Sequence, residues 1–254
     1  MKRNTSERRQ QIVELVNQQG KASVESLAAQ FETSVVTIRK DITHLEQAGL
    51  LLRKFGGAVP VQNQSNNAPV NNISKRKLSI AKAALALIND RQRMVIDSGS
   101  TTLALLPLLS EKRGLVVMTN ALHVADQLVS QENEPTLLMT GGTWDAQSQS
   151  FQGQMAEKML REYNFDLAFV GASGIDLNKG TTTFNELTNL TRVMAEVADK
   201  VVVMAESDKL SHKMPNVELT WQQISVLVTD NQLDAAAKAL IEQQGVQVIC
   251  AEPL

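Results

Sequence analysis

The stretch KASVESLAAQFETSVVTIRKDITHLEQAGLLLRKFGGAVP, residues 21–60, decides the fold of the N-terminal part of the chain. Two segments of it carry apolar residues at helical spacing: Val24, Leu27, Ala28 and Phe31, then Val35, Ile38, Ile42 and Leu45. Ser23 stands at an N-cap position before the first segment, and Gly49 follows the second at a C′ position. Two short helices joined by a tight turn are typical of a helix-turn-helix.

The second helix is expected to present a DNA-reading face. Opposite its apolar seam lie short polar and basic residues, flanked by Val36 and Arg39: Ser34, Thr37, Lys40, Asp41 and His44. Such side chains can meet base edges and phosphates in the major groove. Residues 50–59 resemble two strands around a basic turn, a wing that places Arg53 and Lys54 against phosphate or the minor groove. The predicted DNA-binding residues are Ser23, Ser34, Val36, Thr37, Arg39, Lys40, Arg53 and Lys54.

The alternative for this stretch is a small helical module that binds another protein through a solvated charged face. The charge distribution favours DNA. Residues 1–60 hold 9 Lys and Arg against 6 Asp and Glu, whereas the remaining residues hold 16 against 21. The basic excess of +3 therefore lies with the helix-turn-helix, although the whole chain has a net charge of −2. An excess of this size binds DNA weakly, so we expect two or more copies to act together.

Length and composition place the chain among ordinary globular proteins. Its 254 residues suffice for one small and one medium domain, with 43% hydrophobic and 20% charged residues. No apolar run has the length of a transmembrane helix, and the polar start lacks a signal-peptide core. The single cysteine, Cys250, cannot form an internal disulfide. We therefore expect a cytoplasmic protein without a membrane partner.

Residue composition and apolar pattern divide the sequence into three regions. We predict a DNA-binding domain over residues 1–59, a linker over 60–73 rich in Asn, Gln and Pro, and a second domain over 74–254. In the second domain, amphipathic helices alternate with short runs of Val, Leu and Ile at 93–97, 115–119, 136–140, 166–171, 200–205, 226–229 and 246–250. This alternation predicts an α/β fold with a mostly parallel sheet that is covered on both faces.

Ligands of such sheets bind beyond the C-terminal ends of the strands. The first strand runs into DSGSTT, residues 97–102, a glycine-containing turn at a helix start whose N–H and hydroxyl groups suit a phosphate. The turn matches neither a Walker loop nor G-x-G-x-x-G, and an ordinary capped helix start remains the alternative. Other strand ends carry small hydroxyl residues, glycines, two carboxylates and a lysine, which suit a phosphorylated polyhydroxy ligand. The predicted effector-binding residues are Asp97, Ser98, Gly99, Ser100, Thr101, Thr102, Thr119, Asn120, Gly141, Gly142, Asp176, Thr182, Glu186 and Lys209.

The segment TSVVTIRKDITHLEQAGLLLRKFGGA, residues 33–58, resembles the winged helix-turn-helix of the DeoR family of bacterial sugar-operon repressors. Lys40, Ile42 and Phe55 are mild departures from its pattern, and Val36 stands where many relatives carry a polar residue. The motifs DSGSTT, TN, GG, GASGID, TTTFNE and SDKL resemble the effector domain of that family. The segments SFQGQMAE, GIDLNKGTTTFNE and MPNV look nearest to repressors of sorbitol (glucitol) and galactitol operons.

This resemblance implies a repressor that binds operator DNA, senses a phosphorylated sugar or sugar alcohol, and forms a homo-oligomer of four or more copies. It implies an effector domain similar in fold to ribose-5-phosphate isomerase. An isomerase with a DNA-binding appendage is the alternative, kept open by Asp176 and Glu186. GASGID lacks the second acidic residue of the isomerase loop, and TTTFNE replaces its glycine run, so we expect no catalysis. The three histidines have no metal-ligand spacing, so neither a metal nor another cofactor is expected. Activation in place of repression stays open.

Overall fold

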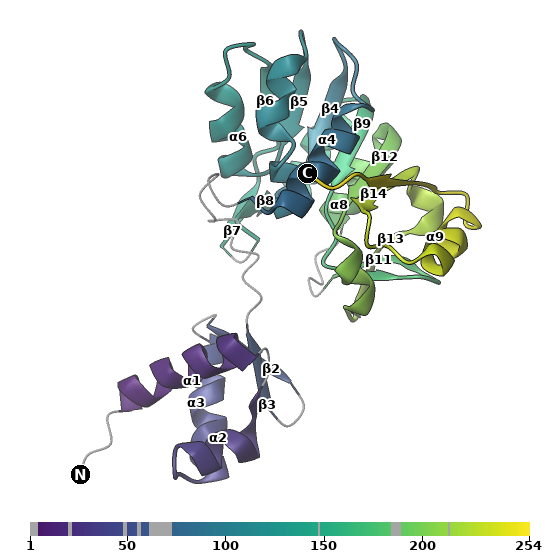
Figure 1. Cartoon of the computed structure of the whole chain (residues 1–254). Coiled ribbons are helices and arrows are strands. Elements are labelled where there is room, and N and C mark those ends of the chain that lie inside the picture. Colours follow the sequence, from purple (N-terminus) through teal and green to yellow (C-terminus); the bar gives the residue numbers. More distant parts are fainter. Residues whose placement is uncertain are drawn as a thin grey trace. The chain divides into compact units, whose positions relative to one another are not determined.

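The computed structural model describes residues 5–19, 22–47, 50–54, 57–60, 73–146, 148–183, 189–212 and 214–254. The chain divides into two compact units, Met1–Ser65 and Asn66–Leu254 (Figure 1). Most of the predicted linker, residues 61–72, lies outside the described residues, as do Gly49, Phe55 and Glu186.

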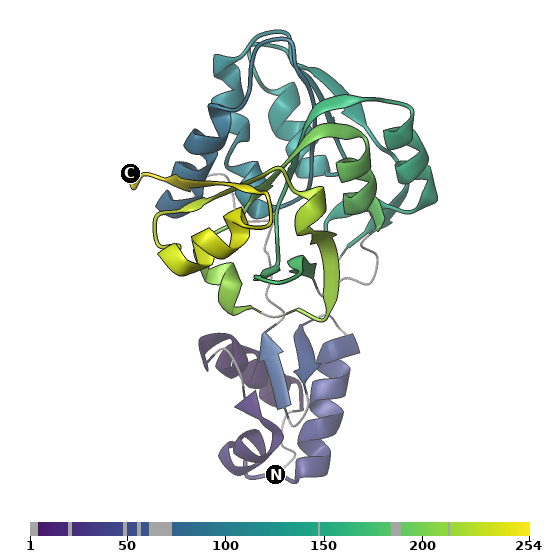
Figure 2. The ribbon, with the colours of Figure 1, turned by 90° about the vertical axis from the view of Figure 1, so that its right-hand side faces the viewer.

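The N-terminal unit is a winged helix-turn-helix, as predicted. Its elements can be followed in Figure 2: α1 Thr5–Gln19, β1 Ala22–Ser23, α2 Val24–Gln30, α3 Val35–Gln47, β2 Leu51–Lys54 and β3 Gly57–Pro60. The strands form an antiparallel sheet in the order β1-β3-β2. Gly57 is required where β3 meets β1, because a Cβ at that position would lie 2.2 Å from the Ala22 carbonyl oxygen. The helix faces and the sheet enclose one apolar core that includes Ile12, Leu27, Ile38 and Leu51.

The C-terminal unit is built on a parallel sheet of seven described strands in the order β15-β14-β12-β9-β4-β5-β6. In chain order the strands are β4 Arg93–Ile96, β5 Val116–Thr119, β6 Thr136–Met139, β9 Phe165–Val170, β12 Ala198–Met204, β14 Val226–Asp230 and β15 Gln247–Ala251. This arrangement confirms the predicted fold class.

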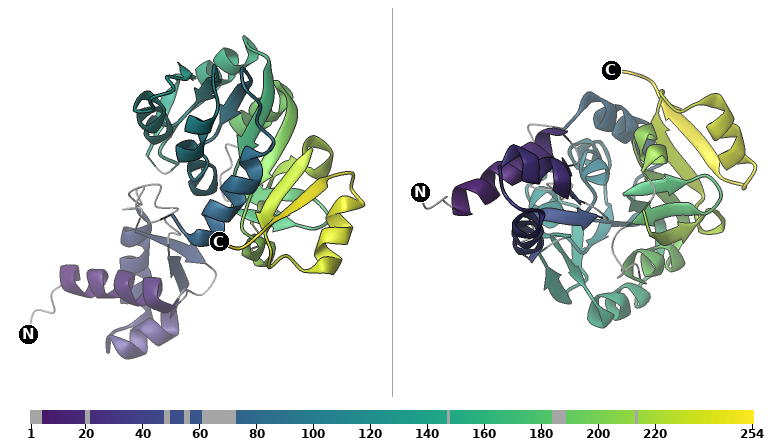
Figure 3. Two further views of the ribbon diagram at one scale, coloured as in Figure 1. Left: turned by 45° about the horizontal axis from the view of Figure 1, so that its top comes forward. Right: turned by 90° about the horizontal axis from the view of Figure 1, so that it is seen from below.

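Alternation along the strands creates a core on each face of the sheet. Met94 and Ile96 of β4 face one core, and Val95 between them faces the other. The first core is covered by α4 Lys75–Leu85, α5 Ser100–Leu103, the 3-10 helix η2 Leu106–Glu111 and α6 Leu122–Val129. The second is covered by α7 Gln154–Arg161, α8 Asn189–Glu196 and α9 Ala235–Glu242 (Figure 3). Both faces are therefore buried, which explains the near-continuous apolar strands.

Several elements differ from the sequence-based expectation. The helix expected after the DSGSTT turn is split into α5 and η2, because Pro107 stands at the start of η2 and cannot continue a helix. A hairpin of β7 Thr143–Asp145 and β8 Ser150–Gln152 was not predicted. Nor was the antiparallel sheet of β10 Gly174–Asp176, β11 Gly180–Thr183 and β13 Asn216–Thr220. Across the described part of the chain, no helix combines the length and apolarity needed to cross a membrane.

Candidate nucleic-acid interface and strand-end binding site

Two predicted DNA-binding serines serve as helix caps. The Ser23 hydroxyl accepts a hydrogen bond from the Ser26 N–H at 3.0 Å, at the start of α2. Ser34 does the same before α3, where its hydroxyl lies 3.1 Å from the Thr37 N–H that it accepts and 2.8 Å from the Thr37 hydroxyl. These bonds satisfy N–H groups that a helix start leaves without partners, so both serines set the direction of their helices.

The exposed face of α3 carries cations around an apolar side chain. Val36 is 62% exposed, and Arg39, Lys40 and His44 are exposed beside it. The opposite face buries Ile38, Ile42 and Leu45 in the core of the unit. A helix with this division can place a methyl group against thymine and basic groups against phosphate.

The expectation that Asp41 belongs to this face is wrong. Asp41 is 2% exposed, and its two carboxylate oxygens accept hydrogen bonds from Arg8 Nε at 2.7 Å and Arg9 Nε at 2.9 Å. At 100° per residue, position 41 lies about 40° from the buried position 45 and about 60° from the buried position 38, so it falls at the edge of the buried face. Its burial withdraws the only carboxylate of residues 35–45 from the DNA-reading face and ties α3 to α1.

The wing is present as a two-stranded hairpin. The register pairs Arg53 with Ala58 and Lys54 with Gly57, so both basic residues lie on β2 close to the turn. Their side chains lie outside the described part of the structure. Their predicted phosphate or minor-groove contacts remain predictions.

In the C-terminal unit, Asp97 organises the turn that follows β4. Its Oδ1 accepts hydrogen bonds from the Gly99 N–H at 2.9 Å and from the Thr102 hydroxyl at 2.6 Å. Its Oδ2 accepts from the Gly171 N–H at 2.6 Å, which joins this turn to the end of β9. Burial raises the pKa of Asp97, and these hydrogen bonds oppose that rise. Asp97 thus shapes the turn, and the Thr102 hydroxyl is engaged in the same network.

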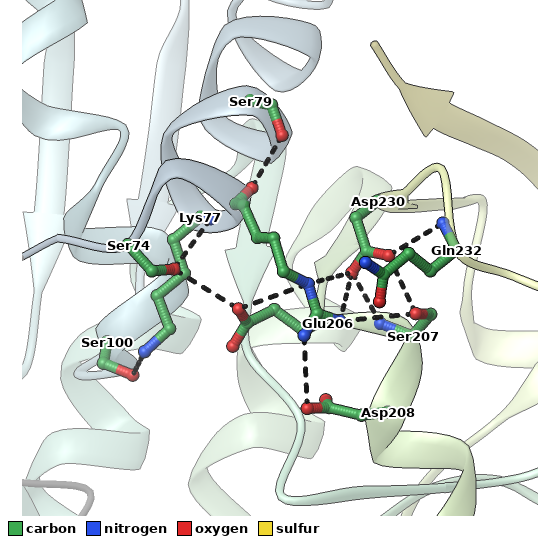
Figure 4. Close-up of polar contacts among 10 residues, drawn as sticks. Ser74, Lys77, Ser79, Ser100, Glu206, Ser207, Asp208, Asp230 and Gln232 are labelled. Atoms are coloured by element: carbon green, nitrogen blue, oxygen red, sulfur yellow. Dashed lines mark hydrogen bonds and ion pairs between the residues drawn. The ribbon is translucent and has the colours of Figure 1, made fainter. Parts of the chain in front are cut away.

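A pair of lysines marks one end of the strand-end site. Lys77 of α4, which was not predicted, donates from Nζ to the Ser100 hydroxyl at 3.0 Å (Figure 4). The pKa of Lys209, on the 3-10 helix η3 Ser207–Ser211, is lowered by burial and further by the charge of Lys77, while Asp208 and Glu206 oppose this. The charge of Lys77, which lies beside Ser100, thus disfavours the charged form of Lys209, and a bound anion would relieve this repulsion.

A sequence signal for Lys77 exists. Lys75, Arg76 and Lys77 occupy the first turn of α4, which contains no acidic residue. Cations are disfavoured at that end of a helix by its dipole, so such a run indicates partners elsewhere in the fold or in a ligand.

Asn120 and His123 form a second part of the strand-end site, next to the DSGSTT turn. Asn120 is 3% exposed, and its Nδ2 donates to the Phe151 carbonyl at 3.2 Å, whereas its Oδ1 is buried without a partner among the described residues. His123 bonds the Ser98 backbone, and because its Nε2 is buried and also without a described partner, that bond uses Nδ1. Burial lowers the pKa of His123, which favours the neutral ring with an acceptor at Nε2. Both orphaned atoms are therefore acceptors.

Several predicted effector residues are placed in turns or in the interior. Gly141 and Gly142 have φ values of +61° and +111°, and a Cβ on Gly142 would lie 2.6 Å from the Gln152 carbonyl oxygen. The Thr119 hydroxyl accepts from the Ala121 N–H at 3.2 Å, and Thr101 is buried. Asp176 accepts from the Asn178 N–H at 2.9 Å in the turn between β10 and β11. Thr182 is 3% exposed, and its hydroxyl is buried without a described partner.

Glu218 of β13 is an acidic residue near the site that the sequence did not indicate. Its Oε1 accepts a hydrogen bond from the Thr191 hydroxyl at 3.0 Å. Burial raises the pKa of Glu218 to about 7, and the charge of Asp97 contributes to the rise. Within the described ranges, no three His, Cys, Asp or Glu residues gather as a metal site would require.

A winged helix-turn-helix joined to an α/β unit with a basic strand-end site is the layout of a ligand-responsive transcriptional regulator. Residues 8–64 match the DeoR-like helix-turn-helix domain, and residues 72–231 match the DeoR C terminal sensor domain. The chain belongs to the DeoR family and is a DNA-binding regulator of transcription rather than an enzyme.

Full-length relatives agree with this assignment. A protein of Escherichia coli O157:H7, named as a candidate repressor of the aga operon, is 37% identical over 96% of this chain and 93% of its own. The regulator GlpR of Haloferax volcanii is 34% identical over 96% and 97%. An L-fucose operon activator of Haemophilus influenzae is 31% identical over 94% and 97%. A D-ribose-5-phosphate isomerase in complex with phospho-erythronic acid is a structural neighbour, with 20% identity, a TM-score of 0.42 and coverage of 57% and 58%.

Proposed function

We propose that this protein represses a carbohydrate or sugar-alcohol operon and leaves its operator when a phosphorylated sugar or hexitol binds at the strand ends of the C-terminal unit. The observation that carries the proposal is the Lys77 ammonium group 3.0 Å from the Ser100 hydroxyl in the turn after β4, in a chain that belongs to a family of transcriptional regulators. Operator binding places this function in the cytoplasm.

The phosphate is supported by charge. Lys77 reaches a neutral hydroxyl, and the nearby Lys209 has a pKa lowered by burial and by the Lys77 charge. A phosphate between the two ammonium groups would accept charge-assisted hydrogen bonds from both. Ser100 and the turn that Asp97 holds in place supply further donors.

The polyhydroxy part of the ligand is supported by the orphaned acceptors. Asn120 Oδ1 and His123 Nε2 are buried acceptors that each require a donor. Sugar and hexitol hydroxyls are donors of this kind, whereas inorganic phosphate has less to offer them. The two ends of the site thus favour a molecule with phosphate at one end and hydroxyl groups along its length.

The sign of regulation and the operon are parts of the same proposal. The names of the relatives include repression of an aga operon and activation of an L-fucose operon. Repression of a hexitol operon, such as that for sorbitol or galactitol, is the form we propose. Transcript levels of neighbouring carbohydrate genes in a deletion strain would test it, because a fall where a rise is expected makes the protein an activator.

The oligomer is proposed from charge. A net charge of +3 over residues 1–60 gives one copy weak affinity for DNA, and four or more copies would multiply it. Light scattering of the full chain tests this, and a monomer at micromolar concentration would refute it.

The ligand is tested first by thermal shift with hexitol, hexose and pentose phosphates, each beside its unphosphorylated parent. A ligand present at about 100 times its dissociation constant stabilises by about 2.7 kcal/mol. We expect a phosphorylated member to raise the melting temperature and its parent to do so weakly. The same compound should release the protein from a duplex selected out of a random-sequence pool, as read by fluorescence anisotropy. If no phosphorylated member changes either quantity, the proposed effector is wrong.

A further inference from the structure

Arg76, the residue before Lys77, is the centre of an ionic network at the start of α4. Its Nη2 lies 2.8 Å from Asp230 Oδ2, and its Nη1 lies 3.5 Å from Asp208 Oδ2. Its Nε lies 3.2 Å from Asp230 Oδ2 and 3.8 Å from Glu206 Oε1. One guanidinium thus joins the first turn of α4 to the end of β14 and to the segment that follows β12.

Asp230 is a fixed anchor for this network. It is 1% exposed, and it accepts hydrogen bonds from the Ser207 N–H at 2.9 Å, the Ser207 hydroxyl at 2.8 Å and the Gln232 N–H at 3.0 Å (Figure 4). Burial alone would raise the pKa of Asp230, but the bonds from Ser207, Arg76 and Gln232 lower it overall. Asp230 is therefore a carboxylate at neutral pH and holds the Arg76 charge in place.

The same two segments carry the lysine pair. Lys77 lies on the first turn of α4 with Arg76, and Lys209 lies on η3 with Asp208. Ser74, the N-cap of α4, also donates to Glu206 at 3.3 Å (Figure 4). Three cations and three carboxylates gather here: Arg76, Lys77 and Lys209 with Glu206, Asp208 and Asp230.

A phosphate would change this balance. It would engage Lys77 and Lys209, and because the charge of Lys209 now also acts on Asp208 and Glu206, it would leave those carboxylates to Arg76. The Arg76 contacts to Asp208 and Glu206 are long, at 3.5 and 3.8 Å, so they have room to shorten. The first turn of α4 would then move against η3.

The position of α4 in the chain gives that movement a consequence. β3 of the wing ends at Pro60, and α4, which begins at Lys75, is the next described element of regular structure. The chain that leaves the DNA-binding unit therefore enters the C-terminal unit at the turn that carries Arg76 and Lys77.

We propose that Arg76 is a positioning residue that couples the effector site to the DNA-binding unit: it holds the first turn of α4 against residues 206–208 and transmits occupancy of the Lys77–Lys209 pair to the N-terminus of α4. The coupling role rests on the proposed function. In this role Arg76 controls the response of DNA binding to the ligand without contacting DNA or the ligand.

The experiment measures coupling separately from binding. The affinity of the full chain for the selected duplex is measured with and without the phosphorylated compound that gives the largest thermal shift. Binding of that compound is also measured alone. Allosteric coupling is typically about 5- to 150-fold. In Arg76→Gln we expect that factor to fall below about 3-fold. We expect affinity for the duplex without the compound to stay within about 3-fold and affinity for the compound to stay within about 10-fold.

Two further variants and a control keep the result clear. Asp208→Asn changes a 52% exposed side chain and should lower the coupling factor partly, with an unchanged melting temperature, even if Arg76→Gln folds poorly. Arg76→Lys keeps the charge without the planar fork and should give an intermediate factor. Arg161→Gln removes ion pairs of 3.5 and 3.4 Å on α7 and should leave the factor unchanged.

Two outcomes would overturn the coupling role in different ways. If the native protein responds to the compound and Arg76→Gln and Asp208→Asn respond equally well, the coupling role is wrong while the proposed function stands. If no phosphorylated compound lowers the affinity of the native protein for the duplex, the proposed function is wrong, and the coupling role is then wrong as well.

Discussion

Asp41 in the N-terminal unit is buried and Lys209 in the C-terminal unit is partly buried, and their surroundings differ. Asp41 is held by two arginines at 2.7 and 2.9 Å, so its charge is matched within the unit. Lys209 lies near a second cation, Lys77, which contributes to the lowering of its pKa. Helix α3 therefore rests on a completed network of ion pairs, whereas the proposed effector site contains a repulsion between two lysines that the proposed ligand would relieve.

The same contrast holds for hydrogen bonds. The hydroxyl groups of Ser23 and Ser34 accept hydrogen bonds from N–H groups at the helix starts. At the strand ends, Asn120 Oδ1 and His123 Nε2 are buried acceptors without described partners. A completed N-terminal unit and a strand-end site with unpaired acceptors fit the proposed ligand-controlled switch, because a ligand shifts an equilibrium only by its different affinity for the two states.

The largest effect is expected from breaking the completed network. Asp41→Asn leaves Arg8 and Arg9 facing a neutral amide and should destabilise the N-terminal unit by about 3 kcal/mol, the lower end for a broken buried ion pair because the arginines are partly exposed. Urea unfolding followed by hydrogen exchange would locate the loss in residues 5–60. Glu46→Gln, an exposed change on the same helix, should cost less than about 0.5 kcal/mol. If Asp41→Asn lowers the free energy of unfolding no more than this control does, Asp41 does not stabilise the packing of α3.

The incomplete site is tested by removing one of its cations. Lys209→Gln should weaken binding of the phosphorylated ligand by about 2 kcal/mol, or about 30-fold, through a lost charge-assisted bond. Folding stability should change little, because the change removes the repulsion with Lys77 together with the attraction to Asp208 and Glu206. Isothermal titration checks the affinity. Lys238→Gln, on α9 with an ion pair to Glu242 at 3.8 Å, is the matched control and should bind the ligand normally. Normal binding by Lys209→Gln would place the phosphate elsewhere.

Glu218 sharpens the comparison through pH. Its pKa is raised from 4.5 to about 7 in the folded protein, so between these values the folded state binds more protons than the unfolded chain. Stability of the C-terminal unit should therefore decline as the pH rises through that window. Because Glu218 is only partly buried, we expect Glu218→Gln to reduce this decline by roughly 1 kcal/mol between about pH 5 and pH 8. Urea titrations at both pH values test it, and equal declines in the two proteins would contradict it.

The fold was largely readable from the sequence because its signals are local. Helical spacing and the cap at Ser23 mark the helices, and doubly buried strands show as apolar runs. The sheet of β10, β11 and β13 escaped because β11 reads GTTT and pairs with a strand more than 30 residues away. Pairing across such a distance leaves no mark in a short window of sequence.

The site was readable only where its residues follow strands. The DSGSTT turn and Asn120 lie at strand ends, where the topology directs attention. Lys77 lies on a helix, and its place beside Ser100 depends on how α4 packs on the sheet. The position of Asp41 was predicted wrongly because charged residues were assigned to the exposed face of α3. An aspartate with two arginine partners can instead be buried.

The smallest effect expected is at the reading face itself. Lys40 is exposed on α3, so Lys40→Ala should leave stability within about 0.5 kcal/mol and should weaken binding of the selected duplex by about 1 kcal/mol, while lowering the salt dependence by about one ion. Anisotropy titrations at several salt concentrations measure both. Lys158→Ala, exposed on α7, is the control for loss of a positive charge and should bind DNA normally. If Lys40→Ala instead lowers affinity together with stability, Lys40 supports the fold as Asp41 does. Helix α3 would then not divide into a buried side that supports the fold and an exposed side that is free to bind DNA.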